Sequence, residues 1–284
     1  MEFTGKLKGK VAVVAGATRG AGRGIACMLG EAGATVYCTG RSVRGHASDK
    51  RRSETIEETA EMVTARGGTG IYVQVDHTNH AQVKALFDQV DQEQSGRLDV
   101  LVNDLTGDGN MEFKHFLQHS LEKGLKLLKN GSLSHIATSY YGVPLMVKNG
   151  GGLLVEVTDG IDAAINEWNF YYDLEKAINI RLARSLAIHL REHKIAVVSL
   201  TPGFLRSEEM LEHFGVKEEN WRDGIRNDKY FAYSETPFYV GKAVVALACD
   251  RKVMRKSGQA LYVGKLAREY NFTDIDGSQP VWAF

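Results

Sequence analysis

The sequence predicts a doubly wound α/β fold, in which helices cover both faces of a mostly parallel, seven-stranded sheet. Three observations support this prediction. Short runs of apolar and β-branched residues alternate with longer stretches of helical periodicity. Several of the short runs are continuously apolar, as strands buried on both faces are. A glycine-rich turn joins the first of these runs to the first helical stretch.

The expected strands are short, and the stretches between them are long enough for a helix to cross back over the sheet. Strands are expected at residues 11–15, 35–39, 71–75, 100–103, 153–158, 196–200 and 259–263. Helices are expected at residues 21–32, 52–66, 79–95, 112–129, 132–148, 173–193 and 237–250. Because the two kinds of element alternate, successive strands should pair in parallel, and residues 1–284 should form a single domain.

Two stretches do not fit this alternation. Residues 41–52 are polar and basic, and residues 202–236 are long, charged and rich in aromatic side chains. Loops of such length are usually lids or binding segments, so we expect a substrate lid at about residues 204–236. Its aromatic side chains either line an apolar substrate pocket or pack the lid onto the body. Residues from about 264 to 284 form a C-terminal extension without an assigned role.

The composition argues against several classes of protein. Lys and Arg together number 35, as do Asp and Glu, so the chain lacks the basic excess of proteins that bind nucleic acids or anionic membranes. No segment approaches the roughly 18 apolar residues that a membrane-spanning helix needs. The first ten residues contain no apolar run and are not expected to be a signal peptide.

Cysteine and histidine usage points to a reduced compartment without a bound metal. The 3 cysteines form no Cys-x-x-Cys pair, which favours a cytoplasmic location. His115 and His119 have helical spacing, as do His189 and His193, but neither pair has a third ligand nearby. We therefore expect no metal site.

The glycine-rich turn indicates a nucleotide-binding site. Gly16, Gly20 and Gly22 give the spacing G-x-x-x-G-x-G, and Thr18 and Arg19 lie within the turn. Glycine permits a tight turn and lets the backbone approach a ligand, while the amino terminus of the following helix attracts a pyrophosphate. This is the arrangement of a Rossmann-type dinucleotide site.

The end of the second expected strand indicates which dinucleotide is bound. An NAD-selective site usually has a carboxylate there, which accepts hydrogen bonds from the ribose hydroxyls. This sequence instead has Gly40 followed by Arg41. The guanidinium groups of Arg41 and Arg19 suit a 2′-phosphate, which arginine can bind through two hydrogen bonds. We therefore expect NADPH to be preferred over NADH; in the alternative, Arg41 is only a solvated loop charge.

Tyr172 and Lys176 are the expected catalytic pair. Residues four apart share one face of a helix, so a phenol and an ammonium group would meet there. A nearby cation lowers the pKa of a phenol, which is ordinarily about 10. A tyrosine tuned in this way can exchange a proton with a carbonyl or alcohol oxygen near neutral pH.

With these motifs in this order, the sequence resembles the short-chain dehydrogenase/reductase family over about residues 8–265. Tyr172 and Lys176 match the family's Y-x-x-x-K signature, and the region at residues 240–277 looks like one branch of the family. The resemblance implies an NADP(H)-dependent oxidoreductase that interconverts a carbonyl and an alcohol. In that reaction Tyr172 would be the general acid/base, and Lys176 would lower its pKa and hold the nicotinamide ribose.

The resemblance also implies further contacts with the cofactor. Asp76 matches the acid that contacts adenine, and Asn103 matches the first position of the family's N-N-A-G element. Pro202 and Gly203 match the P-G turn beside the nicotinamide. Ser207 falls where a cofactor-binding threonine is usual.

The sequence departs from the family pattern beside the reacting centre. The serine that usually donates to the substrate oxygen is replaced by Asp159, which follows Thr158. An ionised Asp159 would repel an alkoxide at contact distance. Either Asp159 is protonated and donates, or it contacts another polar group of the substrate, or Thr158 takes the donor role. An ionised Asp159 could also accept from an alcohol or anchor a cationic substrate. We favour Thr158 as the donor and Asp159 as a substrate contact.

Two further positions are unusual. The helical asparagine of the family's proton relay is missing, and Lys129 and Asn130 lie near its place. Glu156 falls among valines in an expected strand, where a carboxylate should be buried and paired, by default with an arginine.

The sequence is compatible with three functions. The leading interpretation is an oxidoreductase acting on a small, hydrophobic carbonyl or alcohol, and the resemblance implies a homodimer or homotetramer formed through the helices at residues 132–148 and 173–193. A second interpretation is a catalytically impaired NADP(H)-binding sensor or interaction protein. A third is an isomerase or dehydratase that uses the same tyrosine. Because nucleotide binding alone needs no phenol, retention of Tyr172 and Lys176 favours the oxidoreductase.

Overall fold

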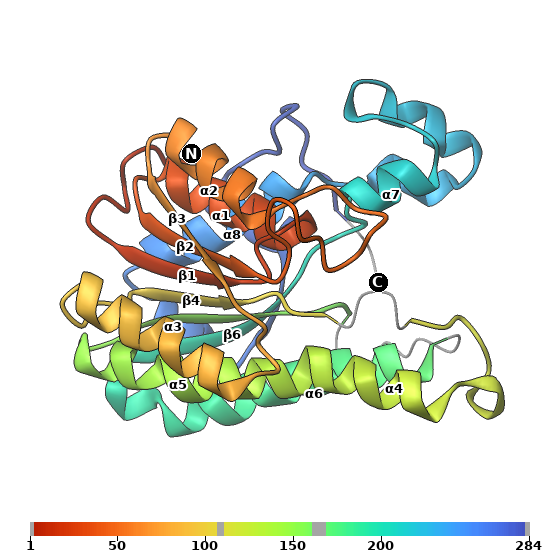
Figure 1. Cartoon of the computed structure of the whole chain (residues 1–284). Helices are drawn as coiled ribbons and strands as arrows, with labels where there is room; N and C mark the ends of the chain where they lie inside the picture. The colour runs from red at the N-terminus through yellow and green to blue at the C-terminus, as the bar shows by residue number, and fades with distance from the viewer. Residues whose placement is uncertain (1–2, 107–110, 161–168, 282–284) are drawn as a thin grey trace.

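The computed structural model describes residues 3–106, 111–160 and 169–281 and contains one seven-stranded sheet (Figure 1). All strand pairs are parallel, and the strand order is β3-β2-β1-β4-β5-β6-β7. The strands are β1 (Val11–Ala15), β2 (Thr35–Gly40), β3 (Thr69–Gln74), β4 (Val100–Asn103), β5 (Gly152–Val157), β6 (Ile195–Thr201) and β7 (Ala260–Tyr262). The predicted fold class is therefore confirmed.

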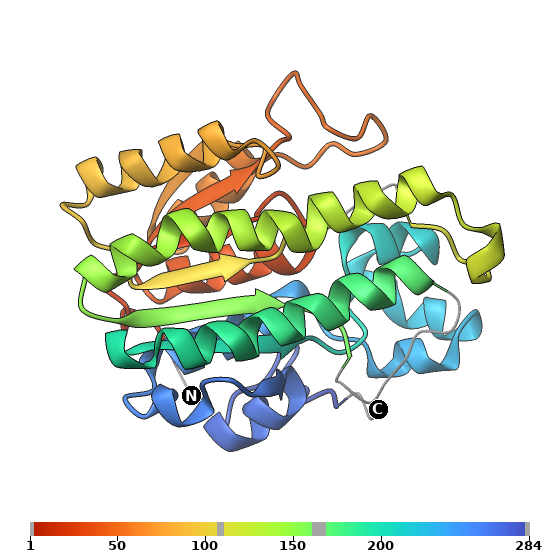
Figure 2. The same ribbon diagram turned by 90° about the horizontal axis from the view of Figure 1, so that it is seen from below.

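Helices cover both faces of the sheet (Figures 1 and 2). Those of the body are α1 (Gly20–Glu31), α2 (Ile56–Ala65), α3 (His80–Glu93), α4 (Leu121–Leu128), α5 (Ser134–Lys148), α6 (Phe170–His189), α8 (Pro237–Cys249) and α9 (Val263–Tyr270). Helices α1, α2 and α8 pack on one face, and α3, α5 and α6 pack on the other. No helix in the described part of the chain is both long enough and apolar enough to cross a membrane.

Packing between α1 and α8 depends on small residues. A Cβ on Gly24 would collide with the backbone of Pro237, and a Cβ on Gly241 would approach the backbone of Gly24. The two helices therefore touch backbone to backbone over β1 and β4. This contact fixes the position of the amino terminus of α1, which lies at the carboxyl edge of the sheet.

The expected helix at residues 112–129 is broken. A 3₁₀ turn (Phe116–Gln118) precedes α4, and a π-helical turn (Lys129–Leu133) joins α4 to α5. A single π turn within a helix often marks a functional position. The missing relay asparagine would have stood in this turn, where Lys129 and Asn130 now lie.

The segment at residues 204–236 forms no part of the sheet. It contains α7 (Glu208–His213) and two 3₁₀ segments, Glu218–Arg226 and Lys229–Tyr233, and it projects from the carboxyl edge of the strands (Figure 1). In parallel α/β sheets ligands bind at this edge, where the strand order reverses, which is between β1 and β4 here.

Candidate active site

The glycine turn has a backbone path that only glycine can follow easily. Gly16 and Gly20 have φ angles of +92° and +56°. A Cβ on Gly16 would collide with the backbone oxygen of Asp104, and a Cβ on Gly22 would collide with the backbone oxygen of Gly16. The turn thus brings the amino terminus of α1 to the edge of the sheet, as a pyrophosphate site requires.

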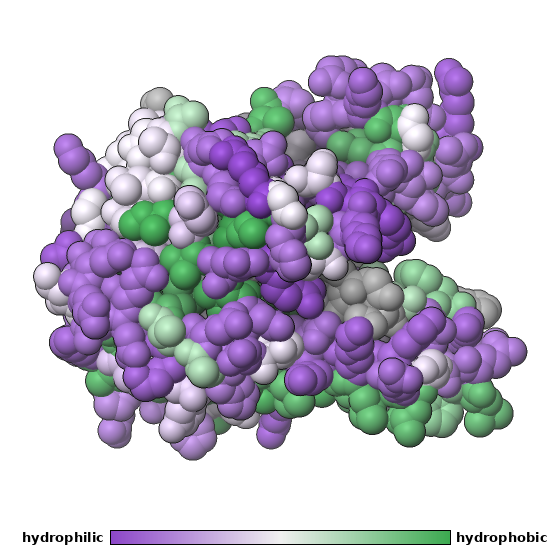
Figure 3. All heavy atoms as spheres, in the orientation of Figure 1, coloured by the Kyte–Doolittle hydropathy of each residue, from purple (hydrophilic) through white to green (hydrophobic). Residues whose placement is uncertain are grey.

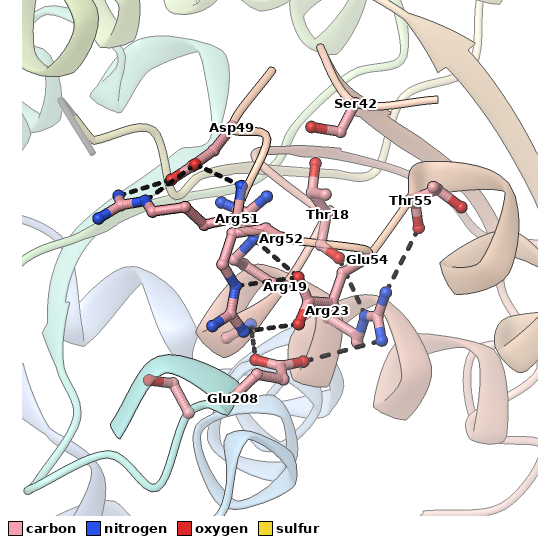
Figure 4. Close-up of polar contacts among 12 residues, drawn as sticks. Thr18, Arg19, Arg23, Ser42, Asp49, Arg51, Arg52, Glu54, Thr55 and Glu208 are labelled. Atoms are coloured by element: carbon pink, nitrogen blue, oxygen red, sulfur yellow. Dashed lines mark hydrogen bonds and ion pairs between the residues drawn. The ribbon is translucent and has the colours of Figure 1, made fainter. Parts of the chain in front are cut away.

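A carboxylate lies at this helix terminus. The backbone N–H of Gly20 donates to Oε2 of Glu208 at 2.8 Å, and Oε1 of the same group is 3.7 Å from Nη1 of Arg23 (Figure 4). Helix α1 has no acidic residue in its own first turn. Helix amino termini attract anions, so Glu208 stands where the cofactor pyrophosphate is expected. This contact could not be predicted from the sequence, because Glu208 is 188 residues away from Gly20.

Arginine side chains gather around the adjacent loop between β2 and α2 (Figure 4). Nη2 of Arg52 lies 2.6 Å from Oε1 of Glu54, and Nε of Arg19 lies 3.5 Å from Oε2 of Glu54. Arg52 also pairs with Glu212 on α7. The Arg52 side chain is only 9% exposed. The basic segment at residues 41–52 therefore supplies an arginine that had not been expected at the phosphate end of the site.

The end of β2 has Gly40 where an NAD-selective site has a carboxylate. A Cβ on Gly40 would lie 2.5 Å from Oγ1 of Thr18, so a larger side chain would require the Thr18 side chain to move. Arg41, the next residue, is exposed, and its carbonyl accepts from Nε2 of Gln74 at 3.0 Å. Its guanidinium can therefore reach a ligand at this edge.

Asp76 and Asn103 also lie at the carboxyl edge. Hydrogen bonds from the backbone and side chain of Thr78, at 2.9 and 2.8 Å, lower the pKa of Asp76, although its burial has the opposite effect. Nδ2 of Asn103 donates to Oγ of Ser139 and to Oε1 of Glu156, both at 3.0 Å. Oδ1 of Asn103 is buried and has no hydrogen-bond partner among the described residues.

The segment after β6 returns to the glycine turn. Pro202 and Gly203 follow the strand, and Ser207 is the N-cap of α7, where its side chain accepts from the backbone N–H of Met210 at 3.3 Å. The Cβ of Ser207 would lie 3.8 Å from a Cβ on Gly20. Residues from the glycine turn and from the start of α7 thus share one edge of the site.

Tyr172, Lys176 and Asp159 lie together at the end of β5 and the start of α6. Oη of Tyr172 donates to Oδ2 of Asp159 at 2.8 Å. Nζ of Lys176 lies 5.1 Å from the centre of the Tyr172 ring and donates to Oε1 of Glu175 at 3.1 Å. The tyrosine and the lysine thus share a helix face, but each is hydrogen-bonded to a carboxylate: Tyr172 to Asp159, and Lys176 to Glu175.

These carboxylates change the expected electrostatics. Burial raises the pKa of Tyr172 well above its usual value, and the charges of Asp159, Glu175 and Asp104 raise it further. Burial alone would lower the pKa of Lys176, but Glu175 raises it. The net pKa of Tyr172 is thus raised by burial and by these carboxylates, and the expected lowering by Lys176 stays a prediction. The ammonium group is paired with Glu175, while the phenol proton is held by Asp159.

The structure also corrects the role favoured for Thr158. Its Oγ1 donates to the backbone oxygen of Lys176 at 2.9 Å, and the residue is 3% exposed. A hydroxyl committed to the backbone of α6 is not available as the donor to a substrate. Asp159 is exposed and is the residue that meets the phenol.

Glu156 has a partner that the sequence did not reveal. Its Oε2 lies 2.5 Å from Nδ1 of His135, and its Oε1 accepts from Oγ of Ser139 at 3.2 Å. All three side chains are buried. The Glu156 carboxylate raises the pKa of His135 against the effect of burial. The expected arginine partner is replaced by a histidine on α5, which in turn contacts the backbone of Leu105.

The aromatic side chains of the segment at residues 204–236 pack on one another. The ring centres of Phe214 and Phe231 are 4.4 Å apart, those of Phe204 and Phe231 are 5.4 Å apart, and those of Trp221 and Phe231 are 5.8 Å apart. The guanidinium of Arg206 lies 4.1 Å from the centre of the Trp221 ring. The segment thus has a small core of its own, and Figure 3 shows the molecule hollowed between this segment and the helices α4 and α6.

The sequence matches the short chain dehydrogenase family over residues 10–218. Dehydrogenase/reductase SDR family member 1 of Mus musculus is 39% identical over 279 residues, covering 95% of this chain and 85% of that protein. The Homo sapiens protein of the same name is 38% identical over 277 residues, with the same coverage. These matches confirm the predicted resemblance to one branch of the short-chain dehydrogenase/reductases.

More distant relatives share the fold. A 3-oxoacyl-[acyl-carrier-protein] reductase of Aquifex aeolicus is 29% identical, covering 84% of this chain and 96% of that protein. The crystal structure of a hydroxysteroid dehydrogenase from Escherichia coli superposes with a TM-score of 0.73 at 24% identity, covering 91% of this chain and 96% of that one. At this identity the likeness establishes the fold alone.

Proposed function

Because the chain belongs to the short-chain dehydrogenase/reductase family, we propose that it is an NADP(H)-dependent enzyme that interconverts a carbonyl compound and an alcohol. The observation that carries this proposal is the placement of the Tyr172 phenol beside Lys176, at the carboxyl edge of the sheet that also carries the glycine turn. When bound, the nicotinamide supplies or accepts the hydride.

The residues at this edge fit such a cofactor. The glycine turn and the N–H of Gly20 would hold the pyrophosphate, as the carboxylate of Glu208 at the same N–H supports. Arg19 and Arg41 would bind the 2′-phosphate, since Gly40 stands in place of the carboxylate that selects NAD. Further residues proposed to contact the cofactor are Thr18, Gly16, Gly22, Asp76, Asn103, Pro202, Gly203 and Ser207.

Tyr172 is proposed as the general acid/base. With its pKa raised, the phenol is protonated at neutral pH and suits the donation of a proton to a carbonyl oxygen better than its removal from an alcohol. Lys176, held by Glu175, is proposed to bind the nicotinamide ribose. Reduction is thus the direction that this arrangement supports.

The test is turnover of NADPH with a panel of carbonyl compounds. We expect Tyr172→Phe to lower kcat/KM by about 10²- to 10⁴-fold, as for loss of a general acid, while binding of NADPH is retained. The neighbouring Tyr171→Phe is the matched control and should keep activity. NADPH should bind at least about tenfold more tightly than NADH, and Arg41→Ala should reduce that ratio.

A second candidate function is that of a cofactor-binding sensor. The carboxylate at the position of the family's serine favours it, because Asp159 opposes an alkoxide beside Tyr172. Tight NADPH binding without turnover of any carbonyl compound, alcohol or imine would establish the sensor over the enzyme. In the cell, the proposed location is cytoplasmic.

A further inference from the structure

We propose that the substrate of this site carries a positively charged nitrogen at its reacting carbon, so that the enzyme interconverts an iminium ion and an amine. The inference rests on the proposed function for its hydride donor and redefines the group that accepts the hydride. It follows from which side chains surround the phenol of Tyr172.

The side chain beside the phenol is an anion that accepts a proton. Oδ2 of Asp159 accepts the hydrogen bond of the Tyr172 hydroxyl at 2.8 Å, and Asp159 is exposed. The neighbouring hydroxyl of Thr158 is turned into α6, where it donates to the backbone oxygen of Lys176 at 2.9 Å. Neither residue therefore offers a neutral donor to a substrate oxygen.

The nearby cation does not offset Asp159, because it already has an anionic partner. Nζ of Lys176 lies 3.1 Å from Oε1 of Glu175, whose side chain is completely buried. Among the described side chains that contact Tyr172 or Lys176, the two carboxylates of Asp159 and Glu175 thus outnumber the one ammonium group.

The carboxylate of Asp159 favours a cationic hydride acceptor over a neutral one. Hydride addition to a neutral ketone places negative charge on an oxygen beside Asp159, and like charges disfavour that change. An iminium ion instead carries a positive charge on its nitrogen, which Asp159 attracts. Hydride addition neutralises this charge and places no negative charge beside Asp159. In the reverse direction, the positive charge that develops on an amine as it loses hydride is stabilised by the same carboxylate.

The chemical balance needs no proton donor. The iminium carbon gains a hydride, the electron pair of the C=N bond becomes the lone pair of the amine nitrogen, and the reduced nicotinamide cofactor is oxidised. With a ketone, by contrast, the oxygen must also receive a proton from Tyr172. The two reactions therefore depend differently on Tyr172 and Asp159.

The first experiment compares two molecules of similar shape, N-methyl-3,4-dihydroisoquinolinium and 1-tetralone, as substrates with NADPH. The N-methyl group fixes the positive charge at every pH, and the rate without enzyme is subtracted. We expect kcat/KM for the iminium ion to exceed that for the ketone by about tenfold or more.

Asp159→Asn should lower this ratio by about tenfold, and Tyr172→Phe should raise it, because only the ketone needs the phenolic proton. Glu192→Gln, in the 3₁₀ turn Arg191–His193 that follows α6, removes the same charge and should leave the ratio unchanged.

The second experiment measures binding without any reaction. Calorimetry of the full chain with the unreactive cation N,N-dimethyl-tetrahydroisoquinolinium and with its neutral analogue isochroman should show tighter binding of the cation. Asp159→Asn should abolish the difference while the protein still unfolds at its usual temperature.

The outcomes separate this inference from the proposed function. Ketone turnover equal to or above iminium turnover in the unmutated enzyme would overturn the inference and leave the carbonyl reductase standing. Binding of the cation that depends on Asp159, with no turnover of either compound, would defeat the proposed enzyme and overturn iminium reduction as well, because only a cation-binding site would remain. Equal binding of cation and neutral analogue overturns the inference in every case.

Discussion

Thr158 lies one residue beyond the end of β5, and its conformation decides which side chain reaches the reacting centre. The strand ends at Val157, and the backbone N–H of Thr158 still donates to Leu200 of β6 at 3.0 Å. Its side chain turns inward to the backbone of α6, so the following residue turns outward. Asp159 reaches Tyr172 for this reason.

Replacement of Thr158 should therefore affect stability more than chemistry. Thr158→Val removes a buried hydrogen bond to the carbonyl of Lys176, so we expect the free energy of unfolding to fall by about 1 kcal/mol. The ratio of iminium to ketone turnover should not change. Urea unfolding and kinetics check both parts, with Thr158→Ser as the control that keeps the hydroxyl. A loss of turnover of a hundredfold or more in a stably folded valine variant would instead make Thr158 the substrate donor.

At this scale, the sequence revealed pairs that are close along the chain but not pairs that folding brings together. Tyr172 and Lys176 are four residues apart, and helical spacing was enough to predict their contact. The partner of Glu156 could not be predicted, because His135 lies on the helix α5 and Glu156 lies in the strand β5. The two side chains meet only when the helix packs on the sheet. The pairing of Lys176 with Glu175 was missed for a different reason, since adjacent helical residues do not normally face each other.

Three elements meet at the phosphate end of the site, and ion pairs join them. The amino terminus of α1 contacts Glu208 at the start of α7, and Arg52 of the β2–α2 loop contacts Glu212 in the next turn of α7. Helix α7 was not predicted, because six residues with mixed charge carry little periodicity. Its position couples the segment at residues 204–236 to the place where a dinucleotide pyrophosphate is expected.

The carboxylate of Glu208 should compete with the cofactor. It accepts from the N–H of Gly20, a group that a pyrophosphate also needs, and the two anions repel one another. We expect Glu208→Gln to lower the Kd for NADPH by about three- to tenfold, which corresponds to about 0.7–1.4 kcal/mol. Quenching of protein fluorescence by NADPH measures this change.

Glu209→Gln is the matched control, because Glu209 is exposed and belongs to the same turn of α7. It removes the same charge without touching α1, so its Kd should match that of the unmutated protein. Weaker NADPH binding in Glu208→Gln would mean that Glu208 supports the cofactor site instead of competing for it.

Over the whole molecule, the parallel, doubly wound arrangement of the sheet followed from simple rules. Apolar runs buried on both faces, separated by helices, permit few arrangements other than a parallel doubly wound sheet. The helix expected at residues 112–129 begins only at Leu121, after the 3₁₀ turn Phe116–Gln118, and its π-helical junction with α5 was not predicted either. A single domain for residues 1–284 remains a prediction.

The helices α4, α5 and α6 carry apolar side chains that are exposed in the described part of the chain. Figure 3 shows apolar side chains along the edge of the molecule formed by these helices. The exposed residues on them are Leu121, Leu125, Ile136, Tyr140, Phe170, Leu174 and Ile188. Several recur four residues apart, which places them on one face of each helix. Contiguous apolar surface of this kind marks an interface.

This face should join two copies of the chain, as the family resemblance also implies. A dimer that buries it would remove the exposed surface of Leu125, which is 55% exposed, and of Ile188, which is 74% exposed. We expect light scattering to give at least twice the chain mass of 31.4 kDa, with a tetramer as the larger possibility. Leu125→Asp combined with Leu174→Asp should yield monomers, because two buried carboxylates would face each other across the interface. Ile275→Asp is the control, since Ile275 is 53% exposed but lies outside these helices. A monomeric unmutated protein at micromolar concentration would show that this face serves another partner.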